Sequence, residues 1–148
     1  MTHKITPFLW FNGQAEEATS FYISVFKNAK AGRVTKGPNG AVISTTFTLE
    51  GQEFMALNGG PQYSFTPAIS LFVNCETQRE VDELWDKLTA GGKPGRCGWL
   101  EDKFGLSWQI IPTVLGKLLN DPDRARAQRV MQAMLKINKL DIAQLEAA

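Results

Sequence analysis

Few residues in this 148-residue sequence can act as nucleophiles, general bases or metal ligands. The single histidine, His3, lies close to the start of the chain. The two cysteines, Cys75 and Cys97, form neither a CxxC pair nor a disulfide framework, which favours a reducing, cytoplasmic location. Arg96 precedes Cys97, but no base stands near this thiol in the sequence. We therefore expect no metal site built on histidines, no histidine base and no catalytic cysteine.

The charged residues show no pattern typical of nucleic-acid or membrane binding. Sixteen Lys and Arg balance fifteen Asp and Glu, so the net charge of +1 gives no broad basic field. Apolar runs such as 8–11, and the mostly apolar stretch 69–73, are far shorter than the roughly 18–20 residues that span a bilayer. We expect no nucleic-acid and no membrane partner. Three charged clusters are predicted to be solvated surface: Asp82, Glu83 and Asp86; Glu101, Asp102 and Lys103; Arg124, Arg126 and Arg129.

The elements that would position a site occur twice along the chain. Hydrophobic spacing and turn residues predict a strand, a helix and three strands, and then the same order again, although residues 93–98 are too rich in glycine to assign. Phe8–Asn12 aligns with Ser70–Asn74, and the helical stripe that begins at Ala18 aligns with the one that begins at Val81. The predicted elements are 5–12, 15–26, 31–36, 41–49 and 52–57, then 68–74, 78–88, 99–102 and 106–112.

Capping residues predict where three helices begin. Thr77 with Glu80 forms a capping box before the second predicted helix. Asp121-Pro122 has the pattern of an N-cap followed by proline at the first helical position, and this helix is predicted to end near residue 137. Asp141 is the predicted cap of a last short helix over 142–147. Residues beyond 113 therefore form a helical extension rather than a third repeat.

With this layout the chain resembles the vicinal oxygen chelate superfamily, which includes glyoxalase I and the bleomycin-resistance proteins and is built from two βαβββ modules. Within it, three segments resemble the PhnB-like family, whose domain carries the name 3-demethylubiquinone-9 3-methyltransferase. The segments are 5–13 with 15–18 and 21–22, then 97–112, then 130–136 with 140–143.

The resemblance implies the fold class and the assembly. We expect an α+β protein with two βαβββ modules, residues 1–62 and 63–113, that form curved mixed β-sheets, and a C-terminal helical extension, residues 114–148, all in one compact unit. A homodimer is also expected. Exposed edge strands and an amphipathic tail with Val130, Met134 and Ile137 would favour a partner copy.

The resemblance also implies four positions for a divalent metal, one on the first and one on the last strand of each module. In this chain they fall at Thr6, near Met55, at Ala68 and at Gln109. None offers an imidazole, thiolate or carboxylate, so we expect no metal and no cofactor. The methyltransferase name has no support in a nucleotide-binding motif, because no G-x-G-x-x-G occurs and Gly91-Gly92 follows a helix rather than a strand.

What remains is a predicted pocket on the concave side of the sheets, opposite the helices. Period-two alternation places Leu9 and Phe11 under the first helix and puts the alternate residues on the concave side. The predicted function is binding of a small, partly aromatic or apolar organic ligand by a metal-free protein, with its chemistry unknown. The candidate ligand-binding residues are Phe8, Trp10, Met55, Ser70, Phe72, Ser107 and Gln109.

Two other interpretations stay open. The chain could be a metal-independent enzyme, namely a lyase, an isomerase or a methyltransferase, with Gln109 and Ser107 as polar anchors. It could also be a structural or regulatory dimer in which Phe8, Trp10 and Phe72 only fill a closed core. Trp85 and Trp108 are expected in the core under either interpretation.

Overall fold

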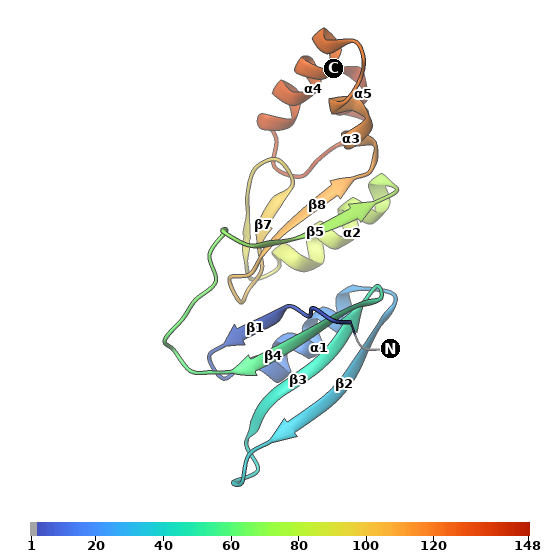
Figure 1. Ribbon diagram of the computed structural model, residues 1–148. Coiled ribbons are helices and arrows are strands. Elements are labelled where there is room, and N and C mark those ends of the chain that lie inside the picture. The colour runs from blue at the N-terminus through green and yellow to red at the C-terminus, as the bar shows by residue number, and fades with distance from the viewer. Residues whose placement is uncertain (1–2) are drawn as a thin grey trace. The chain divides into compact units, whose positions relative to one another are not determined.

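The computed structural model describes residues 3–148 and places them in two compact units that divide between Phe65 and Thr66 (Figure 1). The division lies in the long loop between β4 (Gln52–Asn58) and β5 (Ser70–Cys75). Each unit is described separately. No helix in the described residues is both long and apolar enough to cross a membrane.

The first unit is a four-stranded sheet with a helix packed on one face. Its strands lie in the order β1-β4-β3-β2; β1 is parallel to β4, and the other pairs are antiparallel. The turns at Gly40 and Gly51 need positive φ angles, which glycine adopts at little cost. The elements are β1 (Phe8–Phe11), α1 (Ala15–Val25), β2 (Ala29–Lys36), β3 (Val42–Leu49) and β4 (Gln52–Asn58).

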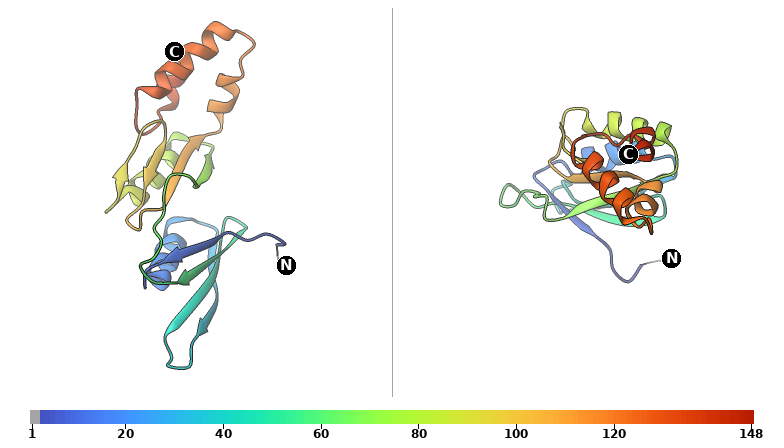
Figure 2. Two further views of the ribbon diagram at one scale, coloured as in Figure 1. Left: turned by 60° about the vertical axis from the view of Figure 1, so that its left-hand side comes forward. Right: turned by 90° about the horizontal axis from the view of Figure 1, so that it is seen from above.

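The second unit repeats this plan and adds three helices that lie together beyond one end of its sheet (Figures 1 and 2). The strand order is β5-β8-β7-β6, again with the first pair parallel. The predicted α+β fold of two βαβββ modules with C-terminal helices is confirmed. The elements are β5 (Ser70–Cys75), α2 (Gln78–Thr89), β6 (Lys93–Pro94), β7 (Trp99–Glu101), β8 (Ser107–Pro112), α3 (Val114–Leu119), α4 (Arg124–Leu135) and α5 (Ile142–Ala147).

Each core lies between a sheet and its helix. In the first unit Leu9 and Phe11 are buried, as predicted, and the stacked rings of Phe47 and Phe54 lie beside Tyr22 of α1. The buried residues of β8 and α2 occupy the same place in the second unit, and Trp85 and Trp108 belong to this core, as expected. Burial of this much apolar surface holds the helices in place and leaves the opposite sheet faces uncovered by them.

The capping signals identify two of the three helix starts. The hydroxyl of Thr77 accepts a hydrogen bond from the Glu80 N–H at 3.1 Å, and the carboxylate of Asp141 accepts one from the Gln144 N–H at 3.0 Å. The prediction at Asp121-Pro122 is wrong by two residues, because Asp123 caps α4 through the Arg126 N–H. Asp121 instead bonds the N–H of Asp123 and shapes the turn before the helix. The short helix α3 was not predicted as an element of its own.

Candidate functional site

The open face of the first sheet carries three of the predicted ligand-binding residues. Phe8 on β1 pairs with Met55 on β4, and Trp10 pairs with Leu57, so these four side chains project from the same face. Phe8 is 51% exposed and the other three are half-buried. Because α1 covers the other face, this one offers an apolar surface bordered by aromatic rings.

Trp10 is engaged by the segment that follows β4. Its indole N–H donates to the Gly60 carbonyl at 2.9 Å, and its ring meets the ring of Tyr63 edge-on, with centroids 4.9 Å apart. Gly59 lies so close to the Trp10 ring that a Cβ there would overlap it. Trp10 therefore holds this segment against the sheet, and Tyr63, which is 68% exposed, extends the aromatic surface beyond it.

A carboxylate that sequence reasoning missed lies on the same face. Glu53 precedes Met55 by two positions on β4, so the two side chains project from one face, and its carboxylate accepts a hydrogen bond from the Thr6 hydroxyl at 3.2 Å. Period-two alternation from Met55 would have found it. Glu53 is half-buried. The face thus combines apolar rings with one fixed negative charge.

The open face of the second sheet brings together the other four predicted residues. Ser70 pairs with Ser107, and Phe72 pairs with Gln109, across β5 and β8. The Gln109 side-chain amide donates to the Ser70 hydroxyl at 2.9 Å, which fixes its orientation. Phe72 is 54% exposed, whereas Ser107 is buried and offers almost no surface to a ligand.

The far end of this second face is closed. Ile111 follows Gln109 on the same side of β8, but the C-terminal helices cover it and it is buried. Period-two alternation from Gln109 would put Ile111 on the open face, but it cannot show that the extension packs there. The buried residues of this cluster are Ile111, Leu115, Leu118, Val130, Leu140 and Leu145.

The four positions that the superfamily uses for a metal do not fit one in this chain. The Thr6 hydroxyl donates to Glu53, and the amide nitrogen of Gln109 donates to Ser70. The strand register refines one of these positions. Gln109 pairs with Phe72, and Leu57 pairs with Trp10, which is the residue that aligns with Phe72 in the repeat. Leu57 rather than Met55 is therefore the counterpart of Gln109 in the first unit. Leucine is no ligand either. Among residues 3–148, no group of three or more His, Cys, Asp and Glu residues could hold a metal ion.

Two other titratable groups are buried in the second unit. Burial raises the pKa of the Cys75 thiol to about 12, and the carboxylates of Glu80 and Glu76 add to the shift, so this thiol stays protonated and unreactive at neutral pH. Asp102 is also buried, which corrects the prediction that its cluster is a solvated turn. Its carboxylate accepts hydrogen bonds from three donors: the N–H groups of Phe104 and Leu106 and the indole of Trp108.

Comparisons with known proteins agree with this architecture. A family model described as 3-demethylubiquinone-9 3-methyltransferase matches residues 3–111. A PhnB protein from Bacillus cereus, described provisionally under the same methyltransferase name, is 40% identical with a TM-score of 0.70; the match covers 75% of this chain and 100% of that one. The tail segment 130–143 lies outside the residues that the family model matches. The comparison with curated proteins yields no match.

More distant structures share the fold alone. A protein from Pseudomonas aeruginosa is 20% identical with a TM-score of 0.61, over 75% of this chain and 98% of its own. The fosfomycin resistance protein FosX from Listeria monocytogenes, solved with Mn(II) and a sulfate ion, is 16% identical with a TM-score of 0.55, over 73% of this chain and 89% of its own. At such identities the fold is shared, and the chemistry has to be argued from the residues of this chain.

Proposed function

The chain belongs to the 3-demethylubiquinone-9 3-methyltransferase family of the vicinal oxygen chelate superfamily, and from this premise we propose that it binds a small, partly aromatic or apolar organic molecule without a metal. The observation that carries the proposal is the half exposure of Phe8 and Phe72 on the sheet faces opposite α1 and α2. Large aromatic side chains left uncovered on a rigid sheet are typical of a binding surface.

Each sheet by itself offers its own contacts to such a ligand. The first presents Phe8, Trp10 and Met55, with Tyr63 beside them, and so suits an apolar ring. The second presents Phe72 beside the Gln109 amide and the Ser70 hydroxyl, which can fix the orientation of a polar substituent by hydrogen bonds. Ser107 completes the proposed set as a small buried neighbour of Ser70.

A fluorescence titration with prodan, an uncharged naphthalene dye, tests binding on these faces. We expect Phe8→Ala and Phe72→Ala each to weaken dye binding by about fivefold, which corresponds to about 1 kcal/mol of lost aromatic contact. Val34→Ala is the matched control, because Val34 is a similarly exposed apolar residue on the edge strand β2. Equal affinity in all three variants would contradict the proposal.

Two further measurements address the natural ligand and the metal. A thermal-shift screen of small aromatic compounds, drugs and S-adenosylmethionine should yield a stabilising compound, since a ligand at a hundredfold its Kd adds about 2.7 kcal/mol to the free energy of unfolding. Metal analysis of protein purified without chelators should find only substoichiometric metal. Stoichiometric Zn, Ni, Fe or Mn would overturn the metal-free part of the proposal.

A metal-independent enzyme is the second candidate, and Glu53 favours it. A half-buried carboxylate beside an apolar surface is a group that can move a proton to or from a bound ligand. For a ligand found in the screen, Glu53→Gln should abolish turnover and leave binding within about threefold, a difference of about 0.6 kcal/mol. Binding without turnover in the unaltered protein would leave the ligand-binding role alone.

A further inference from the structure

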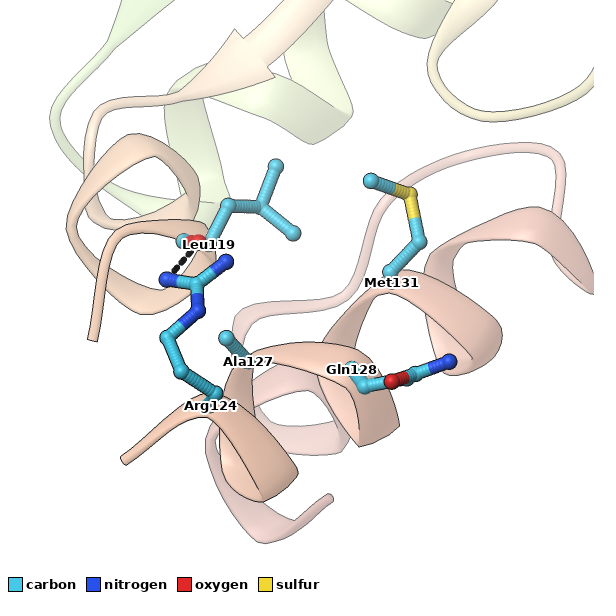
Figure 3. Close-up of a pocket in the computed structure, with 5 residues that line it drawn as sticks. All are labelled: Leu119, Arg124, Ala127, Gln128 and Met131. Atoms are coloured by element: carbon cyan, nitrogen blue, oxygen red, sulfur yellow. Dashed lines mark hydrogen bonds between the residues drawn. The ribbon is translucent and has the colours of Figure 1, made fainter. Parts of the chain in front are cut away.

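A hollow of about 300 Å³ lies in the C-terminal extension, between α3 and α4 (Figure 3). Its volume is at the lower end of the range for small-molecule pockets. It belongs to the segment after residue 111, which the family model does not match, and it lies wholly within the second unit. The lining residues are Leu119, Arg124, Ala127, Gln128 and Met131.

The spacing of the lining residues explains why a hollow forms here. Four of them recur at intervals of three and four along α4 and therefore share one face of that helix. Ala127 forms the floor with a side chain too small to fill the space, and Leu119 and Met131 stand on either side of it (Figure 3). Met131 is 40% exposed, and Leu135 continues the apolar stripe at 50% exposure.

One end of the hollow carries a positioned cation. A single amino group of Arg124, Nη1, donates to the carbonyl of Asp121 at 3.2 Å and, more weakly, to that of Leu119 at 3.5 Å. A guanidinium has five N–H donors, so the Nε and Nη2 donors of this fork remain for a further acceptor.

The neighbouring carboxylates are directed to other partners. Asp121 forms an ion pair with Arg126 at 3.4 Å and accepts the N–H of Asp123. Asp123 caps α4 through the Arg126 N–H. Arg124 thus places a positive charge at the edge of an apolar hollow, and the nearby acids are bonded elsewhere.

We propose that this hollow binds a small organic carboxylate with an apolar chain or ring. The carboxylate accepts hydrogen bonds from the free side of the Arg124 guanidinium, and the apolar part lies on Ala127 between Leu119 and Met131. The Gln128 amide at the rim can bind a second polar group of the ligand. The hollow shares no residue with the open sheet faces, and the proposal does not depend on the function proposed for them.

Octanoate and 1-octanol form a matched pair of probes, because they differ in the charged head and share the chain. In ¹⁵N–¹H NMR titrations of the full chain, octanoate should shift the amides of α3 and α4, and octanol should bind at least about tenfold more weakly, a difference of about 1.4 kcal/mol. Equal binding of the two probes, shifts confined to the sheets, or no shift at all would overturn the proposal.

Variants of exposed residues test the assignment of the cation without disturbing the core. Arg124→Gln should weaken octanoate binding about tenfold and leave octanol binding unchanged. Arg129→Gln is the matched control, because Arg129 is an exposed residue of α4 that does not line the hollow. Met131→Glu, which sets a negative charge against the ligand, should abolish octanoate binding. Unchanged octanoate affinity in Arg124→Gln or Met131→Glu would exclude this binding mode.

Discussion

At the scale of single residues, Asp102 has the most consequential hydrogen bonds in the second unit. One carboxylate oxygen accepts the N–H groups of Phe104 and Leu106 at 2.8 and 3.1 Å, and the other accepts the Trp108 indole at 2.9 Å. The residue therefore closes the turn before β8 and fixes the largest buried side chain of this unit. This turn sets where β8, the strand with Gln109, begins.

Asp102→Asn tests this role, because an amide can replace only one of the two acceptor oxygens. Its NH₂ group would face a backbone N–H or the Trp108 indole and leave a buried donor without a partner, so we expect the free energy of unfolding to fall by about 2 kcal/mol. Urea denaturation measures the change. Asp123→Asn is the control, since Asn caps a helix as well as Asp and its effect should stay below about 0.5 kcal/mol. Equal losses in the two variants would contradict the assigned role.

The two cysteines should differ sharply in reactivity. Cys75 is fully buried with a pKa near 12, whereas Cys97 is partly exposed. Iodoacetamide at pH 8 should modify the folded protein once, at Cys97, and modify both thiols in urea, as read by peptide mass spectrometry. Modification of Cys75 in the folded protein would show that the core opens locally.

Folding raises the pKa of Cys75 above its ordinary value of 9.0. The free energy of unfolding should therefore fall as the pH rises above about 9, because the unfolded chain loses this proton before the folded protein does.

Sequence reasoning places side chains on the correct faces but does not find their partners. Alternation along the strands put Phe8, Trp10, Phe72 and Gln109 opposite the helices, and the pairing of β1 with β4 and β5 with β8 agrees. The hydrogen bonds of Trp10 to Gly60 and of Gln109 to Ser70 join residues 50 and 39 positions apart, and no local pattern contains them. For the same reason, the sequence did not show that Asp102, which stands in a cluster of charged residues, is buried.

At the scale of elements, the loop after β4 depends on one close approach. Gly59→Ala would place a methyl group in the Trp10 ring, so either the ring or the loop must move, and the free energy of unfolding should fall by about 1–3 kcal/mol. Gly116→Ala is the matched control: nothing lies near its Cβ position in α3, and the higher helix propensity of Ala should stabilise the protein by up to about 1 kcal/mol. Urea midpoints of the two variants should therefore move in opposite directions, and a neutral Gly59→Ala would contradict the packing of this loop.

The C-terminal extension is fastened to α2 by Gln78. Its amide nitrogen donates to the Leu140 carbonyl at 3.0 Å and to Asp82, and its amide oxygen accepts the Ile142 N–H at 2.8 Å.

Beside Gln78, Lys139 forms an ion pair with Asp82 at 2.9 Å. Hydrogen bonds from Gln78 and Lys139 lower the pKa of Asp82 in the folded protein. The stabilisation from the pair of Asp82 with Lys139 should therefore be present above the ordinary pKa of 3.8, and it should be lost as the pH falls through the lower pKa of the folded state.

Gln78→Ala removes the bonds to Leu140 and to Ile142, the first residue of α5. We expect a loss of about 1–2 kcal/mol in the free energy of unfolding and faster amide hydrogen exchange at Ile142 and through α5. Arg79→Ala is the neighbouring control, because its ion pair with Glu83 is exposed and should be worth only about 0.3–0.5 kcal/mol. Unchanged exchange in α5 after Gln78→Ala would show that its apolar contacts alone hold the extension.

Helix ends show what a capping signal can and cannot decide. Thr77 was identified by its capping box with Glu80, and Asp141 by its place directly before the short predicted helix over 142–147. Before α4 two aspartates stand two positions apart, Asp121 and Asp123, and both have the type that caps a helix. The choice between them depends on how the turn after α3 closes, which Asp121 achieves through the Asp123 N–H. The sequence alone does not contain that geometry.

At the scale of the whole molecule, the repeat predicted the order of nearly all elements. Two aligned sets of strand and helix patterns sufficed for the mixed sheets and their helices, because each module buries one sheet face under one helix. The covering of Ile111 by the extension was not predictable, since the stripe of Val130, Met134 and Ile137 suggested a partner copy. In the structure this stripe packs inside the extension, so it no longer argues for a dimer.

The prediction of a homodimer therefore depends on the remaining exposed apolar residues. The edge strand β2 carries Lys30, Arg33 and Lys36 and a register shift, features that oppose edge-to-edge pairing. Ile69, which is 59% exposed directly before β5, has no such protection. We expect light scattering to give twice the mass of the chain, and Ile69→Glu to convert the dimer to a monomer because a charge would be buried in the contact. Val34→Glu on β2 is the control and should leave the dimer intact. The measurement is made at about 100 µM, where even a micromolar Kd keeps most chains paired. A monomeric mass for the unaltered chain at this concentration would refute the prediction.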